Sequence, residues 1–458
     1  MGQPTYEEEL IAKKELVESH IGKYCRNIHD VAGMYYPFHY RNKVHAVFGR
    51  LKDEVIAGTY SEGTHTIVPI DNCLIEDAQA SAIIKTVTEL VKSFKIWIYN
   101  EDTGRGVLRH VLVRKGMSTK QIMVVLVTAC PEFPHKNNFV AELRKIHPEI
   151  TTIVQNINEA NTTMVLGERN KPLYGEGYIE DVLCGLRFRI SPNSFYQVNS
   201  AQTQVLYKKA IQAAGLTGKE TVVDAYCGIG TIGMAMASKA GKVLGIELNR
   251  DAVKDAKANA KRNNLNNIHF VAADATEYLT SMAQEGAKAD VVVMDPPRSG
   301  STEEFIQAVA QLAPERVVYV SCNPETLGRD LESFKKVKYR AVEAWPVDMF
   351  GWTNHVETVC LLSKLNVKHH IEVEITMDEL DLTAAESKAT YDEIKAYVLE
   401  KFGFKVSQLY IAQIKRKCGI IERKNYNQSK KEDAKVPKCP PEKEAAIMDA
   451  LKHFQMIP

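Results

Sequence analysis

A cysteine and a glutamate, each at the end of an apolar run, are the residues of this sequence best suited to covalent chemistry. Cys322 ends the run "VVYVSC" and is followed by Asn-Pro, and Glu357 opens the run "ETVCLL". A thiolate is a strong nucleophile and a carboxylate can act as a general base, so the pair suits a reaction with a covalent intermediate. Free cysteine has a pKa of about 8.5. We therefore expect a neighbouring cation to lower the pKa of Cys322, and Arg298 is the candidate.

Three further apolar runs end in acidic residues that could bind a small polar ligand: Asp295 in "VVVMDPPRSG", Glu247 in "GIEL" and Asp274 in "AADA". Another run ends in "DAYCGIG", where Gly228 and Gly230 would let the backbone approach a ligand closely. Glu247 stands where an acid accepts hydrogen bonds from ribose hydroxyls, and Asp274 suits an adenine edge. The third glycine of the dinucleotide motif and the lysine of a phosphate-binding loop are absent, so a nucleoside such as S-adenosylmethionine fits better than a dinucleotide. A plain tight turn with solvated carboxylates is the alternative.

These residues need a parallel sheet to bring them together. Strand-like runs alternate with helix-like stretches from about residue 203 to 365, a pattern typical of a doubly wound α/β sheet. Ligands bind beyond the carboxyl ends of the strands in such a sheet. Because the runs that end at Asp295 and Cys322 are consecutive, we expect neighbouring strands whose ends bring Asp295, Arg298 and Cys322 together.

Methylation of a pyrimidine at C5 is a reaction that needs such a nucleophile and such a base. Addition of a thiolate at C6 turns the ring into an enolate whose C5 can attack a sulfonium methyl group. The C5 proton must then be removed so that the thiol can leave, and a carboxylate such as Glu357 could take it. A surface glutamate without a role is the alternative.

Four motifs, "FYQVN", "DPPRSG", "SCNPETL" and "HVETV", closely resemble those of the S-adenosylmethionine-dependent RNA uracil-C5 methyltransferases, which form 5-methyluridine in tRNA and 23S rRNA. The resemblance runs from about residue 30 to 365. It implies that Cys322 is the nucleophile, that Glu357 is the base and that S-adenosylmethionine is the cofactor. It further implies contacts to the cofactor by Gln197, Tyr226, Glu247, Asp274 and Asp295. The layout favours 23S rRNA as the substrate, with the tRNA T-loop second.

Two departures from the family pattern concern a metal cofactor and a loop. Many relatives carry an N-terminal β-barrel and three closely spaced cysteines that, with a fourth, bind an iron–sulfur cluster. Here the barrel and the three cysteines are missing and Cys73 alone matches the fourth position, so we expect no iron–sulfur cluster and no metal. Gly351 and Trp352 stand before Glu357 at positions that are commonly proline and histidine in relatives.

Changes in the sequence pattern divide the chain into four segments. We expect an N-terminal helical segment over 1–29, a β-rich RNA-binding domain over 30–184, the methyltransferase domain over 185–366 and a basic helical extension over 367–458. The sequence of the extension predicts two helices around Gly403. The second of these ends in basic residues, as in a helix-turn-helix. A solvated basic face on a packing appendage is the alternative for that segment.

Basic residues of the β-rich segment are candidates for contact with RNA phosphates. Arg105, Arg109, Arg114 and Lys115 stand on or beside one expected hairpin. Ordinary solubility of an edge strand is the alternative. A target base would have to be flipped out of its stack to reach Cys322.

Three alternative functions fit these residues less well than uracil methylation does. Cytosine-C5 methyltransferases typically carry a second cysteine near the Asp-Pro-Pro motif, and none stands between Cys227 and Cys322. Amino-group methyltransferases place an aromatic residue after the prolines, where this chain has Arg298. A nucleic-acid-binding regulator would explain the extension but not the set of strand-end residues upstream. The sequence therefore favours an RNA uracil-C5 methyltransferase.

Composition is consistent with an enzyme of the cytoplasm. The 458 residues are 45% hydrophobic and 25% charged, with a net charge of +1, which is ordinary for a globular protein. The nine cysteines are scattered without a CxxC pair, which indicates a reducing compartment. No apolar run approaches the roughly 20 residues that a membrane-spanning helix needs. We expect a cytoplasmic monomer that binds RNA and no membrane.

Overall fold

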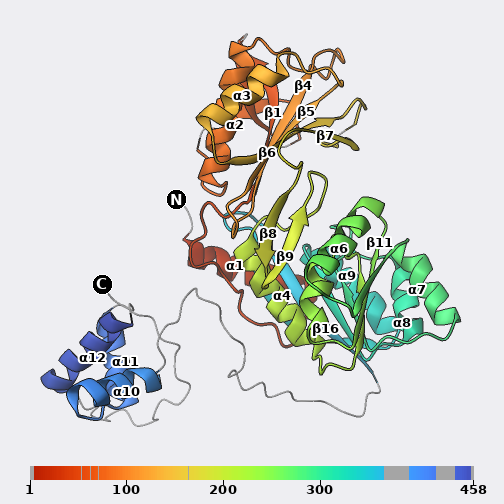
Figure 1. The fold of residues 1–458 in the computed structure, drawn as a ribbon. Coiled ribbons are helices and arrows are strands. Elements are labelled where there is room, and N and C mark those ends of the chain that lie inside the picture. The colour runs from red at the N-terminus through yellow and green to blue at the C-terminus, as the bar shows by residue number, and fades with distance from the viewer. Residues whose placement is uncertain are drawn as a thin grey trace. The chain divides into compact units, whose positions relative to one another are not determined.

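The structure, a computed structural model, describes residues 5–52, 54–61, 63–70, 72–162, 164–365, 391–418 and 439–454. The chain forms two compact units, Met1–Ile371 and Glu372–Pro458. The first unit contains two seven-stranded sheets and a two-stranded hairpin, and the second unit is helical (Figure 1). No helix within the described ranges is long and apolar enough to cross a membrane.

The N-terminal sheet has the strand order β3-β2-β1-β4-β5-β6-β7. Its strands are β1 (Lys43–Leu51), β2 (Glu54–Tyr60), β3 (Ile67–Pro69), β4 (Leu108–Lys115), β5 (Ile122–Thr128), β6 (Ile150–Ile157) and β7 (Arg169–Tyr174). Neighbours are antiparallel except for β5 and β6, which α3 connects as a crossover. Helices α2 (Ala78–Ser93) and α3 (Lys136–Ile146) cover one face (Figure 1), where α2 packs on alternate residues of β1 such as Val44 and Phe48 and α3 packs on β7. The sequence patterns predict the strands of this region but not these two helices.

The other face of the N-terminal sheet packs toward the rest of the first unit. Leu112, Val125 and Val154 on that face belong to the same buried cluster as the second sheet. The hairpin of β8 (Ile179–Leu183) and β9 (Leu186–Ile190) also contributes to this cluster and spans the boundary that we expected between residues 184 and 185.

The second sheet is doubly wound, as the alternating pattern predicts, with the strand order β12-β11-β10-β13-β14-β16-β15. Its strands are β10 (Thr221–Ala225), β11 (Lys242–Glu247), β12 (Ile268–Ala272), β13 (Val291–Met294), β14 (Arg316–Ser321), β15 (Tyr339–Val347) and β16 (Glu357–Lys364). Only β16 runs against its neighbours, β14 and β15. The strand order reverses at β10, which places the switch point of the sheet between β10 and β13.

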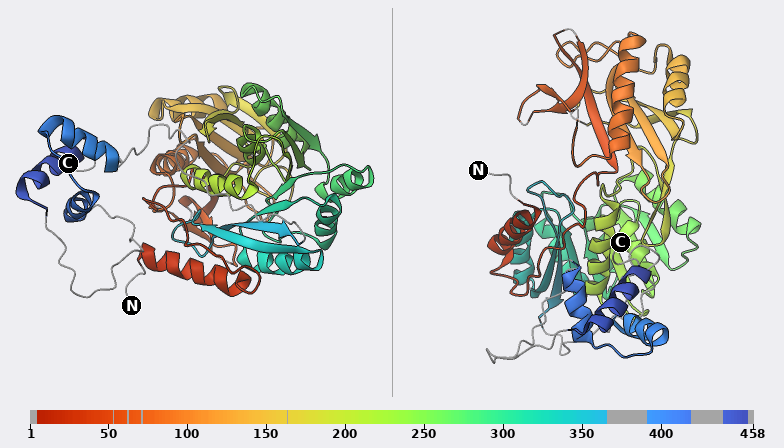
Figure 2. Two further views of the ribbon diagram at one scale, coloured as in Figure 1. Left: turned by 90° about the horizontal axis from the view of Figure 1, so that it is seen from below. Right: turned by 90° about the vertical axis from the view of Figure 1, so that its left-hand side faces the viewer.

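Helices cover both faces of this sheet, as Figure 2 shows. They are α1 (Tyr6–Ile21), α4 (Ser200–Ala214), α5 (Thr231–Ala237), α6 (Arg250–Arg262), α7 (Ala275–Gln284), α8 (Glu303–Leu312) and α9 (Pro324–Lys336). Consecutive residues of the central strands enter opposite cores: Val222 packs with α4, α5 and α6, and Val223 packs with α1, α7, α8 and α9. This alternation is the period-two pattern of a sheet that is buried on both faces.

Helix α1 begins with a capping box, in which Thr5 and Glu8 bind each other's backbone amides. Its residues Val17 and Ile21 are buried against α9. The two helices approach closely at Gly328, where a Cβ atom would lie 2.7 Å from the carbonyl oxygen of His20. The N-terminal segment is therefore an integral part of the layer that covers the second sheet.

The second unit packs three helices, α10 (Tyr391–Phe402), α11 (Gln408–Lys417) and α12 (Pro441–His453), around a small apolar core. The two helices expected around Gly403 are present, with Gly403 at a φ of +75°, whereas α12 was not predicted. Lys401 pairs with Asp449 at 2.8 Å and Lys417 pairs with Glu444. Part of the basic excess that we expected to face RNA is thus used within the unit. The rest of the expected extension, 366–390 and 419–438, lies outside the described residues.

Candidate active site

The ends of β14 and β16 bring Cys322 and Glu357 together. Cys322 directly follows β14, and Glu357 is the first residue of β16. The antiparallel register pairs Val320 with Val359 and Ser321 with Thr358, so the next step puts Cys322 opposite Glu357. Residues directly opposite in such a pair have Cβ atoms about 4.5–5.5 Å apart and point to the same side. The thiol and the carboxyl can therefore reach the same small group.

The loop after β13 lies beside them and is held by α9. Asn323 caps α9 by accepting a hydrogen bond from the amide of Glu325, and its Nδ2 donates to the carbonyl oxygen of Arg298 at 3.4 Å. Thr326 Oγ1 donates to the same carbonyl oxygen at 3.3 Å. These contacts fix the Asp-Pro-Pro-Arg loop against the Cys322 loop, as the expected convergence requires. Asn323 was missed as a positioning residue, although an asparagine before a proline at a helix start indicates such a cap.

The pKa of Cys322 does not follow the expectation. Burial, followed by the charges of Glu357 and Asp295, raises the pKa of the half-buried Cys322 thiol to about 11, although Arg298 acts to lower it. The expected depression of this pKa is therefore wrong for the protein without RNA, because two carboxyls and desolvation outweigh one exposed arginine. Cys322 rests as a neutral thiol.

The two carboxyls at this edge share the same tendency to hold a proton. Glu357 is 4% exposed, and burial, reinforced by the charge of Asp295, raises the pKa of its carboxyl well above the ordinary range, with Arg298 opposing. Burial likewise raises the pKa of Asp295. A carboxyl of raised pKa can hold a proton and release it under mild conditions, which is the property required of an acid–base group.

The end of β10 is a glycine turn with open space over Gly228. Gly228 and Gly230 have φ values of +55° and +81°, and a Cβ atom at Gly228 would meet no atom within 4 Å. At the end of β11, the carboxylate of Glu247 accepts hydrogen bonds from the amides of Gly228 (3.0 Å) and Asn249 (2.8 Å). The glycine turn and the acid are thus fixed to each other next to the switch point, where a ribose can be bound.

Tyr226 directly follows β10, and Asp274 stands two residues beyond the end of β12. Tyr226 adopts a left-handed backbone (φ +62°), and its half-buried ring lies 5.2 Å from that of Phe305 between centroids. A non-glycine residue in this region is strained, and such strain often marks a functional site. Asp274 caps α7 through one oxygen, Oδ1, which accepts from the amides of Thr276 and Glu277 at 2.9 and 3.1 Å. The capping role is enough to explain why an aspartate stands at this position. The second carboxylate oxygen of Asp274 remains available.

Gln197 lies in the segment between β9 and α4, which the N-terminal sheet holds in place. The Nδ2 atom of buried Asn42 donates to the carbonyl oxygen of Gln197 at 2.9 Å and to Ser200 Oγ at 3.0 Å. Arg114 of β4 donates to the carbonyl oxygen of Ser194 at 2.8 Å. The first sheet thus positions the "FYQVN" segment at the edge of the second.

These contacts correct the expected role of the basic cluster on β4. Arg114 is 1% exposed, and Arg109 is 4% exposed and donates to the carbonyl oxygens of Asn158 and Ala160. Lys115 is paired with Asp77 at 2.8 Å. These three cations serve the fold, and Arg105 is the exposed member of the set.

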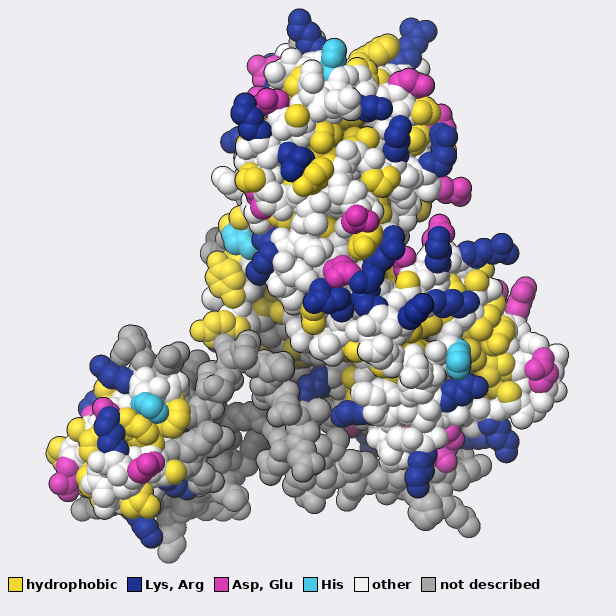
Figure 3. All heavy atoms as spheres, viewed as in Figure 1, with side chains coloured by type: hydrophobic (Ala, Val, Ile, Leu, Met, Phe, Trp, Pro, Cys, Tyr) yellow, Lys and Arg dark blue, Asp and Glu magenta, His cyan; other side chains and the backbone are white. Residues whose placement is uncertain are grey.

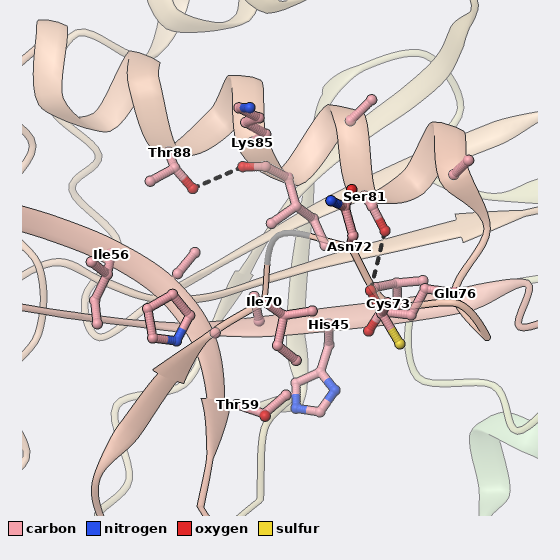
Figure 4. Close-up of a pocket in the computed structure, with 18 of the residues that line it drawn as sticks. His45, Ile56, Thr59, Ile70, Asn72, Cys73, Glu76, Ser81, Lys85 and Thr88 are labelled. Carbon is pink, nitrogen blue, oxygen red and sulfur yellow. Dashed lines mark hydrogen bonds between the residues drawn. The ribbon is translucent and has the colours of Figure 1, made fainter. Parts of the chain in front are cut away.

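A cavity of about 740 Å³ lies elsewhere, between α2 and strands β1 and β2 (Figure 4). It is lined by His45, Cys73 and Glu76 among others, and Ser81 Oγ donates to Glu76 at 3.1 Å. None of the seven expected site residues lines it. Within the described part of the chain, no group of three or more His, Cys, Asp or Glu side chains could hold a metal ion.

The strand order, the glycine turn after the first strand and the acid at the end of the second define an S-adenosylmethionine-dependent methyltransferase fold. Comparison with known proteins gives the family. Residues 169–365 match the family model described as tRNA (uracil-5-)-methyltransferase. An uncharacterised RNA methyltransferase of Halalkalibacterium halodurans is 42% identical over 366 residues, which cover 79% of this chain and 80% of that protein. Another, from Caldanaerobacter subterraneus, is 42% identical over 364 residues, with coverages of 79% and 80%.

A solved structure agrees with these matches. The chain resembles the tRNA (uracil-54, C5)-methyltransferase of Pyrococcus abyssi in complex with S-adenosyl-L-homocysteine, with a TM-score of 0.64 and 28% identity over 78% of this chain and 83% of that one. The chain belongs to the RNA uracil-C5 methyltransferase family. It is an enzyme that uses S-adenosylmethionine to methylate RNA.

Proposed function

We propose that the enzyme methylates C5 of a uridine through a covalent bond between Cys322 Sγ and C6 of the base. The observation that carries this proposal is the β14–β16 register, which puts Cys322 opposite Glu357. One side chain can then act on C6 while the other acts on the adjacent C5.

Each protein group has one task in this scheme. The Cys322 thiol loses its proton and adds to C6, which makes C5 nucleophilic. S-adenosylmethionine, when bound, supplies the electrophilic methyl group that C5 accepts. The Glu357 carboxylate then removes the C5 proton, the C5–C6 double bond re-forms, and Cys322 leaves as the thiolate. Because the resting thiol is neutral, the scheme requires that RNA binding promote its ionisation, and Arg298 is the adjacent cation that favours the thiolate.

The cofactor would be held by the residues around the β10 turn. In this proposal Glu247 binds the ribose, Asp274 binds the adenine edge through its free oxygen, and Tyr226 packs beside the nucleoside. Gln197 and Asp295 bind near the methyl donor. Support comes from the open space over Gly228 and from the fixed orientation of Glu247.

We propose 23S rRNA as the substrate on the layout of the chain. A tRNA T-loop is the second candidate, because the solved relative from Pyrococcus abyssi acts on uracil 54 of tRNA. Incubating the enzyme with transcripts of each RNA that carry tritium at uracil C5 tests both the reaction and the substrate. Release of tritium from one transcript, with 5-methyluridine in the product, is expected. Methylation without release of tritium would contradict the proposal of reaction at C5.

We further propose a cytoplasmic monomer without an iron–sulfur cluster. Cys73 lines the N-terminal cavity as a free cysteine, and one thiolate cannot replace the four that such a cluster needs. Iron analysis and light scattering of protein purified without oxygen test these two points. Stoichiometric iron would contradict the first, and a dimer mass would contradict the second.

A further inference from the structure

A set of partly exposed aromatic rings surrounds Trp352, which lies on the loop that leads to Glu357. Trp352 stacks on Phe38 with ring centroids 5.5 Å apart and an interplanar angle of 26°. Phe38 in turn contacts Tyr36 at 5.3 Å, and Trp352 contacts Tyr6 at 5.6 Å. Tyr36 is 62% exposed and Trp352 is 36% exposed. Figure 3 shows hydrophobic side chains gathered on the surface near the N-terminal end of α1.

The exposed ring of Trp352 rests on a loop that buried polar contacts hold rigidly. Asp348 is fully buried, pairs with Lys13 of α1 at 2.7 Å and accepts a hydrogen bond from Tyr6 at 2.5 Å. Glu9 of α1 accepts a hydrogen bond from the amide of Trp352 at 2.7 Å. From the other side, Tyr40 donates to the carbonyl oxygen of Gly351 at 2.8 Å. Helix α1 and residues 34–40 therefore hold this loop between them.

The backbone at Trp352 is also in an unfavourable conformation. Its φ of +64° is in the left-handed region, which costs a non-glycine residue about 1–2 kcal/mol. A Cβ atom at Gly351 would lie 2.6 Å from the Cε of Met34, so a larger residue there would require the end of the Met34 side chain to move. A strained, tightly held backbone that presents a large ring to solvent is more readily explained by binding than by packing.

The position of the rings relates them to the catalytic edge. Trp352 precedes Glu357 by five residues, with His355 between them. Burial, together with the charges of Arg298 and Lys13, lowers the pKa of His355, which places the exposed Arg298 near this loop as well as near Cys322. Arg298 thus lies near both this loop and Cys322, and Trp352 is carried on the same loop that leads to Glu357.

We propose that Tyr36, Phe38 and Trp352 form a stacking platform for an unpaired base of the RNA substrate, next to the uridine that reacts. The placement beside that uridine rests on the proposed roles of Cys322 and Glu357. Single-stranded RNA is bound mainly by stacking of its bases on aromatic side chains, with cations on its backbone. Removing one base from its stack also leaves neighbouring bases unstacked and free to bind.

The test measures binding without catalysis, using the full chain saturated with S-adenosylhomocysteine. A fluorescein-labelled oligouridylate of about ten nucleotides is the probe. Trp352→Ala should weaken its binding roughly 10- to 100-fold, the usual effect of losing one stacked base. Trp352→Phe should retain affinity within a few-fold, and Trp352→Leu should behave like alanine. Binding of a duplex RNA of equal length should be the same for all variants.

A matched control is Trp97→Ala, because Trp97 is 58% exposed and lies before β4 of the N-terminal sheet. It should bind the oligouridylate as the wild type does. Equal binding by Trp352→Ala and wild type would overturn the platform. So would restoration by leucine as complete as by phenylalanine, since the ring would then only fill space. The outcome is independent of the proposed chemistry, because Cys322→Ala protein should show the same stacking while its failure in methyl transfer is measured separately.

Discussion

Cys322 and Glu357 lie opposite each other across the β14–β16 pair, one step beyond the pairing of Ser321 with Thr358. Cys322 follows β14 and Glu357 opens β16, with α9 and β15 between them in the sequence, and the antiparallel pairing of β14 with β16 brings them together. Because the Cys322 thiol and the Glu357 carboxyl are partly or wholly removed from water, the charge of one affects the protonation of the other. The arrangement makes their protonation states interdependent.

The first prediction concerns the reactivity of Cys322. A pKa of about 11, against an ordinary 9.0, lowers the thiolate fraction near pH 8 by roughly 100-fold. Alkylation of Cys322 by iodoacetamide should therefore be slow in the free enzyme and should rise with pH up to about 11. Peptide mass spectrometry measures the rate at each cysteine.

Two variants test in which direction the neighbouring charges shift the pKa of Cys322. Glu357→Gln removes a charge that raises the Cys322 pKa and should speed alkylation several-fold in alkaline buffer, where the Glu357 carboxyl is ionised. Arg298→Gln removes a charge that lowers the pKa and should slow it. Fast alkylation of Cys322 at pH 7 in the wild type would show that the thiol is already ionised without RNA.

The second prediction concerns the stability of Glu357→Gln. The carboxyl of Glu357 has a higher pKa in the folded than in the unfolded chain, so the folded state binds more protons between the ordinary and the raised pKa. The stability of the wild type should fall as the pH rises through that window. Glu357→Gln should match the wild type near pH 4 and exceed it by about 1–3 kcal/mol in mildly alkaline buffer. Urea unfolding at several pH values provides the comparison, and a gain that is independent of pH would rule out this origin.

Some of these features follow from the sequence and others do not. Strand ends can be recognised locally, so Asp295, Cys322 and Glu357 could be placed at one edge from the order of the apolar runs. The sign of the Cys322 pKa shift could not, because it depends on how deeply three separate loops bury one another. The pairing of Lys13 with Asp348 joins residues 335 positions apart, and the aromatic platform joins residues 36–38 to Trp352. Neither leaves a periodic signal in the chain.

The helices of the N-terminal region also could not be predicted from the sequence pattern. Residues of α2 are apolar on one side, but the short strands around it dominate the pattern from 30 to 184. The burial of Arg109 and Arg114 could not be predicted from the sequence either. A charged residue on an alternating strand is expected to be exposed unless a distant loop covers it. Here carbonyl oxygens of distant loops accept their hydrogen bonds.

A third prediction tests the buried ion pair under the Trp352 loop. Asp348→Ala leaves buried Lys13 with Glu9, at 2.6 Å, as its remaining partner and removes the acceptor of the Tyr6 hydroxyl, which should cost about 1–3 kcal/mol of unfolding free energy. The triple variant Glu9→Gln, Lys13→Met, Asp348→Leu should recover a large part of that loss, because it removes both carboxylates together with the cation that they pair with. A single variant as stable as the wild type in urea unfolding would mean that the pair contributes nothing to the loop.

A fourth prediction concerns the C-terminal unit, Glu372–Pro458. From Lys401 to Lys438 the sequence has eleven basic and three acidic residues. Although Lys401 and Lys417 are paired internally, the remaining excess leads us to expect that deleting the unit weakens RNA binding more than binding of S-adenosylhomocysteine. The dependence of RNA affinity on salt should become shallower, because fewer phosphates are neutralised. Identical affinity and salt dependence would identify the unit as a packing appendage.

The measurement that most directly tests the proposed chemistry is capture of the covalent RNA adduct. Glu357→Gln keeps the nucleophile but lacks the base, so removal of the C5 proton should slow by roughly 10²–10⁴ and methylated RNA should accumulate on Cys322. With labelled RNA and S-adenosylmethionine, denaturing electrophoresis should show a slow band for Glu357→Gln and none for Cys322→Ala or the double variant. Wild-type turnover by Glu357→Gln without a band, or a band that persists in Cys322→Ala, would contradict the assignment of nucleophile and base.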